Sequence, residues 1–171
     1  MFSLRPQCAA LLLFASSPVH ANKPQPWVLR FDGIGPVRVG MTLPQVNSAM
    51  GKRFQIPSDP DEKDCFYINP TKHPGLAIML LHQRVARVDV DGTDTPTSLG
   101  IRNGDSEKRT LTVYGSRMRV EPSFYDAPDG HYLTIFSPGK RVGIRFESYD
   151  GKIKRFYAGT REAIAFVEGC S

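Results

Sequence analysis

The sequence predicts an α+β protein in which an antiparallel sheet carries short helices on one face. Three observations lead to this prediction. One segment occurs twice in the sequence. A short amphipathic stretch follows it each time. Strand-length stretches come next, in which apolar and charged residues alternate. Such alternation indicates a sheet with one buried face and one polar face. We therefore expect two tandem αβββ-type repeats that share an antiparallel sheet, with one face covered by the helices.

The repeated segment is VRVG at residues 37–40 and IRNG at residues 101–104. In each case a second glycine follows eleven residues later, at Gly51 and at Gly115. Such closing glycines suit the left-handed backbone conformation just past the end of a helix. The spacing therefore predicts a helix of two to three turns between the glycines of each pair.

Hydroxyl side chains occupy equivalent positions at the start of both predicted helices. Thr42 and Ser106 follow the first glycine of each pair by two residues. A hydroxyl there can accept a hydrogen bond from a free amide of the first helical turn. Gln45 stands three residues after Thr42, which is the capping-box arrangement. Both helices are thus expected to begin directly after these residues.

Strand-like stretches follow each helix in the same order. Residues 65–67 correspond to 131–133, and residues 75–78 correspond to 143–146, with a small difference in length that loops can absorb. Residues 163–168 are expected to add a short last strand. The expected organisation is a signal peptide at 1–21, a first repeat at 22–94 and a second repeat at 95–171.

Each repeat is expected to contain a hairpin. Asp150-Gly151 between two alternating stretches is a strong signal for a two-residue turn. The equivalent position of the first repeat holds His82-Gln83-Arg84, which is a weaker signal. Around the second turn, Ile144 and Phe146 point to one face and Arg145 to the other.

The first 21 residues have the three-part form of a secretory signal. Arg5 precedes a short apolar run at residues 8–15, and Val-His-Ala ends the segment at Ala21. The run is shorter than the roughly 20 residues that cross a bilayer. We expect cleavage near Ala21, a periplasmic or secreted protein, and no transmembrane segment.

Two cysteines, Cys65 and Cys170, remain after the predicted signal sequence is removed. An even count in an exported chain favours a disulfide, and here only one pairing exists. The alternative is two unpaired thiols. Neither cysteine has a histidine or another cysteine nearby in the sequence, so a metal site is not expected.

Charge and motifs exclude several classes of function. The formal charge is +5, and acidic residues are scattered among the basic ones without a basic run, so nucleic-acid binding is not expected. The sequence has no Gly-x-Ser-x-Gly, no His-Glu-x-x-His and no phosphate-binding glycine loop. We therefore predict no catalytic residues, no metal and no cofactor. The oligomeric state is not indicated.

The predicted binding residues lie in the second repeat. Residues 125–132 place two tyrosines and a histidine around a Pro-Asp-Gly turn, and rigid aromatic side chains on loops are well suited to partner binding. Arginines on the neighbouring strands add a cationic patch, to which Lys154 also contributes. The candidate binding residues are Tyr125, Asp126, His131, Tyr132, Arg117, Arg119, Arg141 and Arg145.

The segment VGMTLPQV at residues 39–46, closed by Met50-Gly51, resembles the opening of the SmpA/OmlA family of small outer-membrane lipoproteins. It is also similar to the repeats of secreted β-lactamase-inhibitory proteins, which carry two such α/β units in tandem. The second copy keeps only the glycines, the cap and the apolar pattern, and no lipidation cysteine follows the apolar run. The inhibitor resemblance implies partner contacts on the exposed sheet face and its loops.

These observations predict an exported, non-enzymatic binding module that engages a protein partner in the cell envelope, with inhibition of an envelope or foreign enzyme as one form of that activity. Two alternatives stay open. One is a binder of anionic envelope glycan or lipid through the cationic face. The other is a hydrolase whose site is assembled from distant residues such as Asp126, His131 and Glu168.

Overall fold

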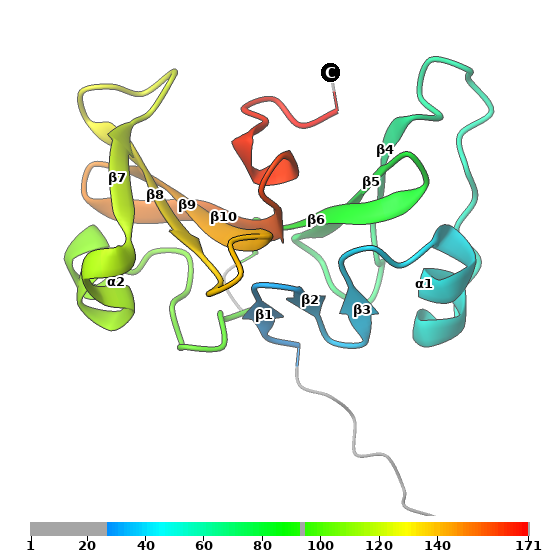
Figure 1. Ribbon diagram of the computed structural model, residues 1–171, viewed down its shortest axis with the longest axis horizontal. Helices are drawn as coiled ribbons and strands as arrows, with labels where there is room; N and C mark the ends of the chain where they lie inside the picture. The colour runs from blue at the N-terminus through cyan, green and yellow to red at the C-terminus, as the bar shows by residue number, and fades with distance from the viewer. Residues whose placement is uncertain (1–26, 93–94, 171) are drawn as a thin grey trace, which may run out of the picture.

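The computed structural model describes residues 27–92 and 95–170, and the predicted signal peptide lies outside these ranges. A seven-stranded antiparallel sheet runs across the molecule in the order β4-β5-β6-β10-β9-β8-β7 (Figure 1). Its strands are β4 (Cys65–Ile68), β5 (Leu76–Leu81), β6 (Arg84–Val90), β7 (Arg119–Pro122), β8 (Gly130–Phe136), β9 (Val142–Tyr149) and β10 (Lys152–Thr160).

One face of this sheet is covered by the helices, as predicted. The helices α1 and α2 lie under its two ends, and a small three-stranded sheet lies between them (Figure 1). The sequence prediction of an α+β fold is therefore confirmed. The bounds are α1 (Leu43–Met50), α2 (Glu107–Tyr114), β1 (Leu29–Arg30), β2 (Gly33–Ile34) and β3 (Val37–Arg38), with short 3-10 helices η1 (Gly115–Arg117) and η2 (Ala163–Ala165).

Both helices begin directly after the predicted capping residues, whereas the predicted left-handed glycine follows α1 (Gly51) but not α2, where Gly115 has a different conformation. The backbone N–H of Thr42 donates to the side chain of Gln45 at 2.8 Å before α1. The hydroxyl of Ser106 accepts from the backbone N–H of Arg109 at 3.1 Å at the start of α2. Gly51 and Gly115 follow the helices with φ of 60° and 72°, which a residue without Cβ adopts at little cost.

The two halves tie the chain segment before the helix to the sheet in the same way. In each half, a backbone N–H before the helix donates to a carbonyl oxygen of the strand after the hairpin turn. The backbone N–H of the same strand residue donates to a carbonyl oxygen of the segment before the helix. The first-half bonds are Gly40 N to Val85 O at 2.7 Å and Val85 N to Met41 O at 2.8 Å; the second-half bonds are Gly104 N to Ile153 O and Ile153 N to Asp105 O, both at 2.8 Å.

Both predicted hairpins are present with two-residue turns. Leu81 pairs with Arg84, and Tyr149 pairs with Lys152, so two residues remain between the strands in each case. Both turn residues have positive φ, 48° and 61° at His82-Gln83 and 50° and 68° at Asp150-Gly151. That combination is the requirement of a type I′ turn.

A continuous hydrophobic core fills the space between the large sheet and the elements below it. It includes Val46 of α1, Tyr114 of α2 and Ile34 of the small sheet, which belong to one cluster with the buried sheet residues Val88 and Phe146. The two halves therefore share one core instead of folding around two.

The opposite sheet face carries the C-terminal segment, residues 161–170, across its centre (Figure 1). The last strand predicted at 163–168 is wrong, because this segment begins with the 3-10 helix η2 and pairs with no strand. Gly143 makes room for it, since a Cβ there would lie 2.7 Å from the Ile164 side chain. The exposed face predicted from alternation is thus covered at its centre and open at its β7–β9 end.

Candidate functional site

The C-terminal segment is fixed to the sheet by a disulfide and by a buried arginine. Cys65 and Cys170 form the predicted disulfide, with a Cα–Cα distance of 5.4 Å. Arg87 of β6, 5% exposed, donates to the carbonyl oxygens of Ala163 and Phe166 at 3.0 Å each. These contacts hold both ends of the segment, so the residues that it carries have fixed positions over the sheet.

Arg87 is itself part of a buried polar cluster. It forms an ion pair with Asp89 at 2.9 Å, donates to the hydroxyl of Tyr67 at 2.6 Å, and lies over the ring of Tyr157. Burial raises the pKa of Tyr67 to about 12, and the negative charge of Asp89 adds to this effect. Burial also raises the pKa of Asp89, while the Arg87 guanidinium acts in the opposite direction. This cluster fixes the segment, and its Arg87 and Asp89 side chains are buried.

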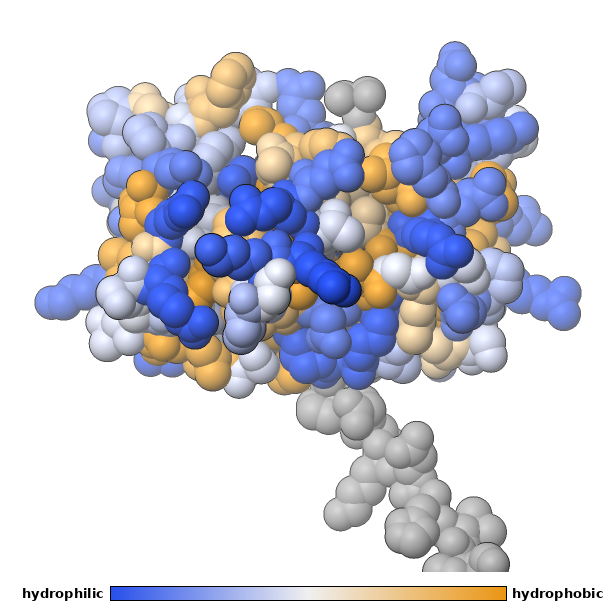
Figure 2. All heavy atoms as spheres, in the orientation of Figure 1, coloured by the Kyte–Doolittle hydropathy of each residue, from blue (hydrophilic) through white to orange (hydrophobic). Residues whose placement is uncertain are grey.

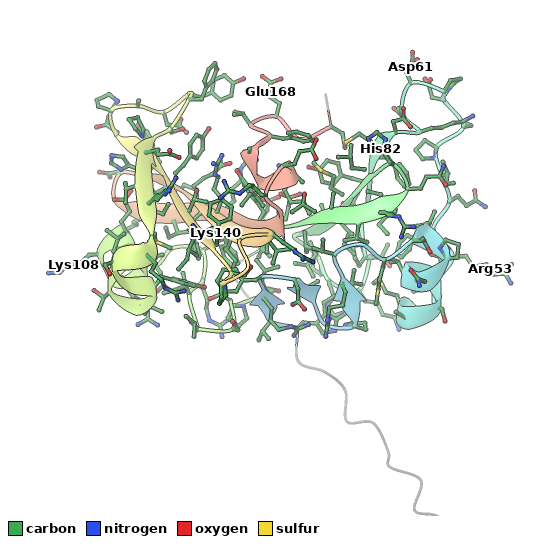
Figure 3. The ribbon with its side chains drawn as sticks, viewed as in Figure 1. Arg53, Asp61, His82, Lys108, Lys140 and Glu168 are labelled. Atoms are coloured by element: carbon green, nitrogen blue, oxygen red, sulfur yellow. A yellow bond between two sulfur atoms is a disulfide. The ribbon has the colours of Figure 1, made fainter. Side chains whose placement is uncertain are left out.

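The connection between β7 and β8 projects two aromatic side chains into solvent. Phe124 is 73% exposed and Tyr125 is 62% exposed, and their rings meet edge to face at a centroid distance of 4.8 Å. The hydroxyl of Tyr125 donates to the carboxylate of Glu168 on the C-terminal segment. Figure 3 shows Glu168 on that segment, on the same side of the sheet as the β7–β8 connection.

A groove of about 500 Å³ opens between this connection and the C-terminal segment. We call it the aromatic groove. Its lining is supplied by both halves of the molecule and by the disulfide itself. The lining residues are Cys65, Leu81, Phe124, Tyr125, Phe166, Val167, Glu168, Gly169 and Cys170.

Asp126 and His131, which are also candidate binding residues of this loop, do not line the aromatic groove. The backbone N–H of Asp126 donates to the Ser123 hydroxyl at 3.3 Å, and Asp126 remains exposed. His131 lies 2.9 Å from the carboxylate of Glu107, which also accepts from the Ser148 hydroxyl. These contacts tie the first turn of α2 to the sheet, so His131 is engaged within the fold.

Tyr132 lies within β8 and is only 7% exposed. This position agrees with the strand-like stretch expected at 131–133 and not with an exposed loop position in the predicted binding segment 125–132. Its ring lies under the guanidinium of Arg145, at 4.9 Å from the centroid. Tyr132 therefore supports Arg145 instead of facing solvent.

The three residues of the hydrolase alternative do not meet. Asp126 bonds to Ser123, His131 to Glu107, and Glu168 to Tyr125. None of the three hydrogen-bonds to another, although all lie in the described part of the chain. Residues 27–92 and 95–170 also contain no group of three or more histidine, cysteine or acidic side chains that could hold a metal ion.

The predicted arginines lie at one end of the sheet. Arg119 belongs to β7 and Arg145 to β9, Arg141 directly precedes β9, and Arg117 lies in η1 after α2. The sequence did not predict two further residues of this region, Phe124 and Arg161. The adjacency of Phe124 to Tyr125 could have indicated the first, whereas Arg161 comes close to Arg141 only through strand pairing.

The comparisons with known proteins assign no family. No family model and no curated protein match the chain. A solved structure of an extracellular protein containing an SCP domain, from Bacillus anthracis str. Ames, is 9% identical, with a TM-score of 0.48. The match covers 90% of this chain and 52% of that one, so the chain spans about half the length of its structural neighbour. Within the described residues, no helix has the length and hydrophobicity needed to cross a membrane.

Proposed function

We propose that this chain is an exported, non-enzymatic binding module that engages a protein partner through the aromatic groove and the adjoining sheet face. The module consists of two copies of one helix–strand unit, and inhibition of a partner enzyme is one form that this activity takes. The observation that carries the proposal is the pair of exposed aromatic side chains, Phe124 and Tyr125, fixed beside the groove.

Phe124 and Tyr125 favour binding through both solvation and conformational entropy. Exposed aromatic rings of this size are unfavourable in water and contribute strongly when a partner covers them. The contact of Tyr125 with Glu168 restricts its rotamers before binding. Because Glu168 belongs to a segment closed by a disulfide, the aromatic groove keeps its shape without a partner. Binding therefore costs less conformational entropy than it would for a flexible loop.

The same features support export as part of the proposal. A disulfide between residues 105 positions apart persists in oxidising compartments and is rare in reducing ones. The N-terminal residues carry the signal-peptide pattern described above. Sequencing of the N-terminus of the mature protein tests this directly. We expect Asn22 as its first residue, and a mature chain that retains the apolar run would contradict export by cleavage.

Site-specific photocrosslinking tests the binding proposal. A photoreactive phenylalanine analogue at position 124 should form an adduct with a protein in an envelope extract. The same analogue at position 99 is the matched control, because Leu99 is 53% exposed and lies outside the aromatic groove. The purified partner should then bind at least about tenfold more weakly to the F124A/Y125A variant, which removes two large contacts, than to L99A.

Two results would overturn the proposal. Identical adducts from positions 124 and 99 would show contact without specificity. An unchanged affinity of the purified partner for F124A/Y125A would place its binding site elsewhere. Both variants replace exposed side chains and should unfold at the wild-type temperature, so a loss of binding would not reflect a loss of structure.

A further inference from the structure

Four arginines converge on the open end of the sheet face. Arg119 lies opposite Thr134, and Thr134 lies opposite Arg145, so these two arginines share one row across three strands. Residues directly opposite one another in antiparallel strands face the same side. Arg145 lies between the core residues Ile144 and Phe146, so this row faces away from the helices.

Arg141 and Arg161 form a second pair, farther along the strands from Arg119 and Arg145. Arg141 precedes β9, and alternation places it on the same face as Arg145. The backbone N–H of Arg161 donates to the carbonyl of Arg141 at 3.0 Å, which brings the two residues side by side. Figure 2 shows strongly hydrophilic side chains gathered over this region, and Lys140 on the same β8–β9 connection is labelled in Figure 3. We call Arg119, Arg141, Arg145 and Arg161 the arginine surface.

The four guanidinium groups of the arginine surface form no ion pair among the described residues, although Glu121 and Glu147 lie on the same face two residues further along β7 and β9. Other arginines of the same sheet face are paired, Arg87 with Asp89 at 2.9 Å and Arg155 with Glu147 at 2.7 Å. Four neighbouring like charges repel one another, and an external anion relieves that repulsion.

Aromatic rings orient two of these guanidinium groups. Arg161 lies 4.1 Å from the ring centroid of Phe136, and Arg145 lies 4.9 Å from that of Tyr132. The Nε of Arg145 also donates to the Thr134 hydroxyl at 3.0 Å. A guanidinium that lies on a ring keeps its terminal N–H groups free at the edge, in the fork that matches a carboxylate. The arginine surface is therefore pre-organised for oxyanions.

We propose that the arginine surface binds an extended acidic segment, rich in Asp and Glu, of the protein partner. This inference rests on the proposed function and specifies the chemistry of the partner. The surface spans about 10 Å across the strands and about 13 Å along them. Carboxylates at alternate positions of an extended chain recur about every 7 Å, so three of them cover that length. Along β7, Arg119 is followed on the same face by Glu121 and then by the connection that carries Phe124, so the arginine surface and the aromatic groove lie along the same edge strand.

A defined peptide tests this proposal. The probe is a fluorescein-labelled peptide of alternating glutamate and threonine, and the neutral control peptide has glutamine in place of glutamate. The mature protein should bind the acidic peptide and not the neutral one, with affinity that falls as salt rises. R119Q/R145Q should weaken binding at least about tenfold, because each lost charged contact contributes strongly.

The matched control is R53Q/K108Q, which removes the same charge from two exposed residues at opposite ends of the molecule (Figure 3). This variant should bind the acidic peptide within about twofold of wild type, since neither residue touches the arginine surface. Equal weakening by both double variants would overturn the proposal, because attraction by net charge alone would explain the result. A second pair, R141Q/R161Q, should weaken binding like R119Q/R145Q, and thermal unfolding shows whether each variant is folded.

Two further outcomes separate this inference from the proposed function. If phosphatidylglycerol vesicles bind more tightly than the peptide with the same dependence on Arg119 and Arg145, the occupant is a lipid headgroup and the acidic-segment proposal is overturned. If position 124 crosslinks a partner but the peptide does not bind, only the further inference fails. Peptide binding that persists while no crosslink forms would leave the arginine surface standing and remove the proposed function.

Discussion

The first half of the molecule (α1 with β4 to β6) and the second half (α2 with β7 to β10) have similar local connections but different sheet faces. In both, a glycine-led segment pairs with the strand after the hairpin, and a capped helix follows. On the sheet face opposite the helices, however, the halves differ. The first half presents Tyr67, Arg87 and Asp89, which lie under the C-terminal segment. The second half presents Phe124 and three residues of the arginine surface, Arg119, Arg141 and Arg145, which are at least partly exposed.

This difference assigns a role to each half. The arginine of the first half is paired, buried and directed at the carbonyl groups of the protein's own C-terminal segment. The four arginines of the arginine surface have no carboxylate within ion-pair distance among the described residues. The first half thus anchors the segment that shapes the aromatic groove, and the second half supplies most of the surface that we propose binds a partner.

The disulfide should give the largest effect on stability. In the C65S/C170S variant the free energy of unfolding should fall by about 4–5 kcal/mol, because a crosslink that closes a loop of this length restricts the unfolded chain strongly. Urea unfolding measures the change. A reducing agent should lower the wild-type midpoint and leave that of the variant unchanged. If the variant and the oxidised wild type unfold at the same urea concentration, the segment is held mainly by Arg87.

Replacing one arginine in each half tests the contrast between them. R87M should lower the free energy of unfolding by about 3 kcal/mol, because it leaves Asp89 buried without its partner. R145M should lower it by about 1 kcal/mol or less, since Arg145 is partly exposed and has no carboxylate partner. Denaturant unfolding of both variants gives the comparison, and equal losses would contradict the division between anchor and open surface.

The pH dependence of R87M gives a separate check on Asp89. Burial raises the folded-state pKa of Asp89 above its ordinary value of 3.8, and loss of the guanidinium removes the main opposing effect. A raised folded-state pKa means that the folded protein binds the proton more tightly than the unfolded chain. The preferential protonation of Asp89 in the folded state stabilises the fold fully below pH 3.8. This stabilisation is lost as the pH rises through the folded-state pKa of Asp89. The deficit of R87M relative to wild type should therefore be smaller at acidic than at neutral pH.

The sequence predicted the local signals of the fold well because they depend on few neighbouring residues. Capping at Thr42 and Ser106, the glycines that end the helices and the Asp150-Gly151 hairpin are all decided within one turn of chain. The disulfide was predictable because only one pairing of Cys65 and Cys170 exists.

What the sequence could not predict depends on contacts between distant residues. The segment at 163–168 has an apolar content that suits a strand, but its place on the sheet is decided by Gly143 and Arg87. Tyr132 and Tyr125 look alike in sequence, and only strand pairing buries one under Arg145 and leaves the other exposed. The proximity of Arg161 to Arg141 likewise arises from pairing across β9 and β10.

A smaller effect is expected where the C-terminal segment crosses the second half. G143A should lower the free energy of unfolding by about 1–3 kcal/mol, because its Cβ would meet the side chains of Ile164 and Phe136 at less than 3 Å. G139A is the control, since a Cβ there meets no atom within 4 Å. Thermal unfolding of both variants measures the difference, and a G143A protein as stable as G139A would show that the segment does not pack closely on β9.

The smallest effects should come from the two hairpin turns, and they should have opposite signs. His82 and Gln83 hold positive φ at a cost that asparagine and glycine avoid, so H82N/Q83G should raise the free energy of unfolding by about 1 kcal/mol. The reverse change in the second half, D150H/G151Q, should lower it by about the same amount. Chemical denaturation of the two variants tests whether the turns are energetically equivalent positions of the two halves. A change of the same sign in both would show that the side chains around each turn, and not its backbone conformation, determine its stability.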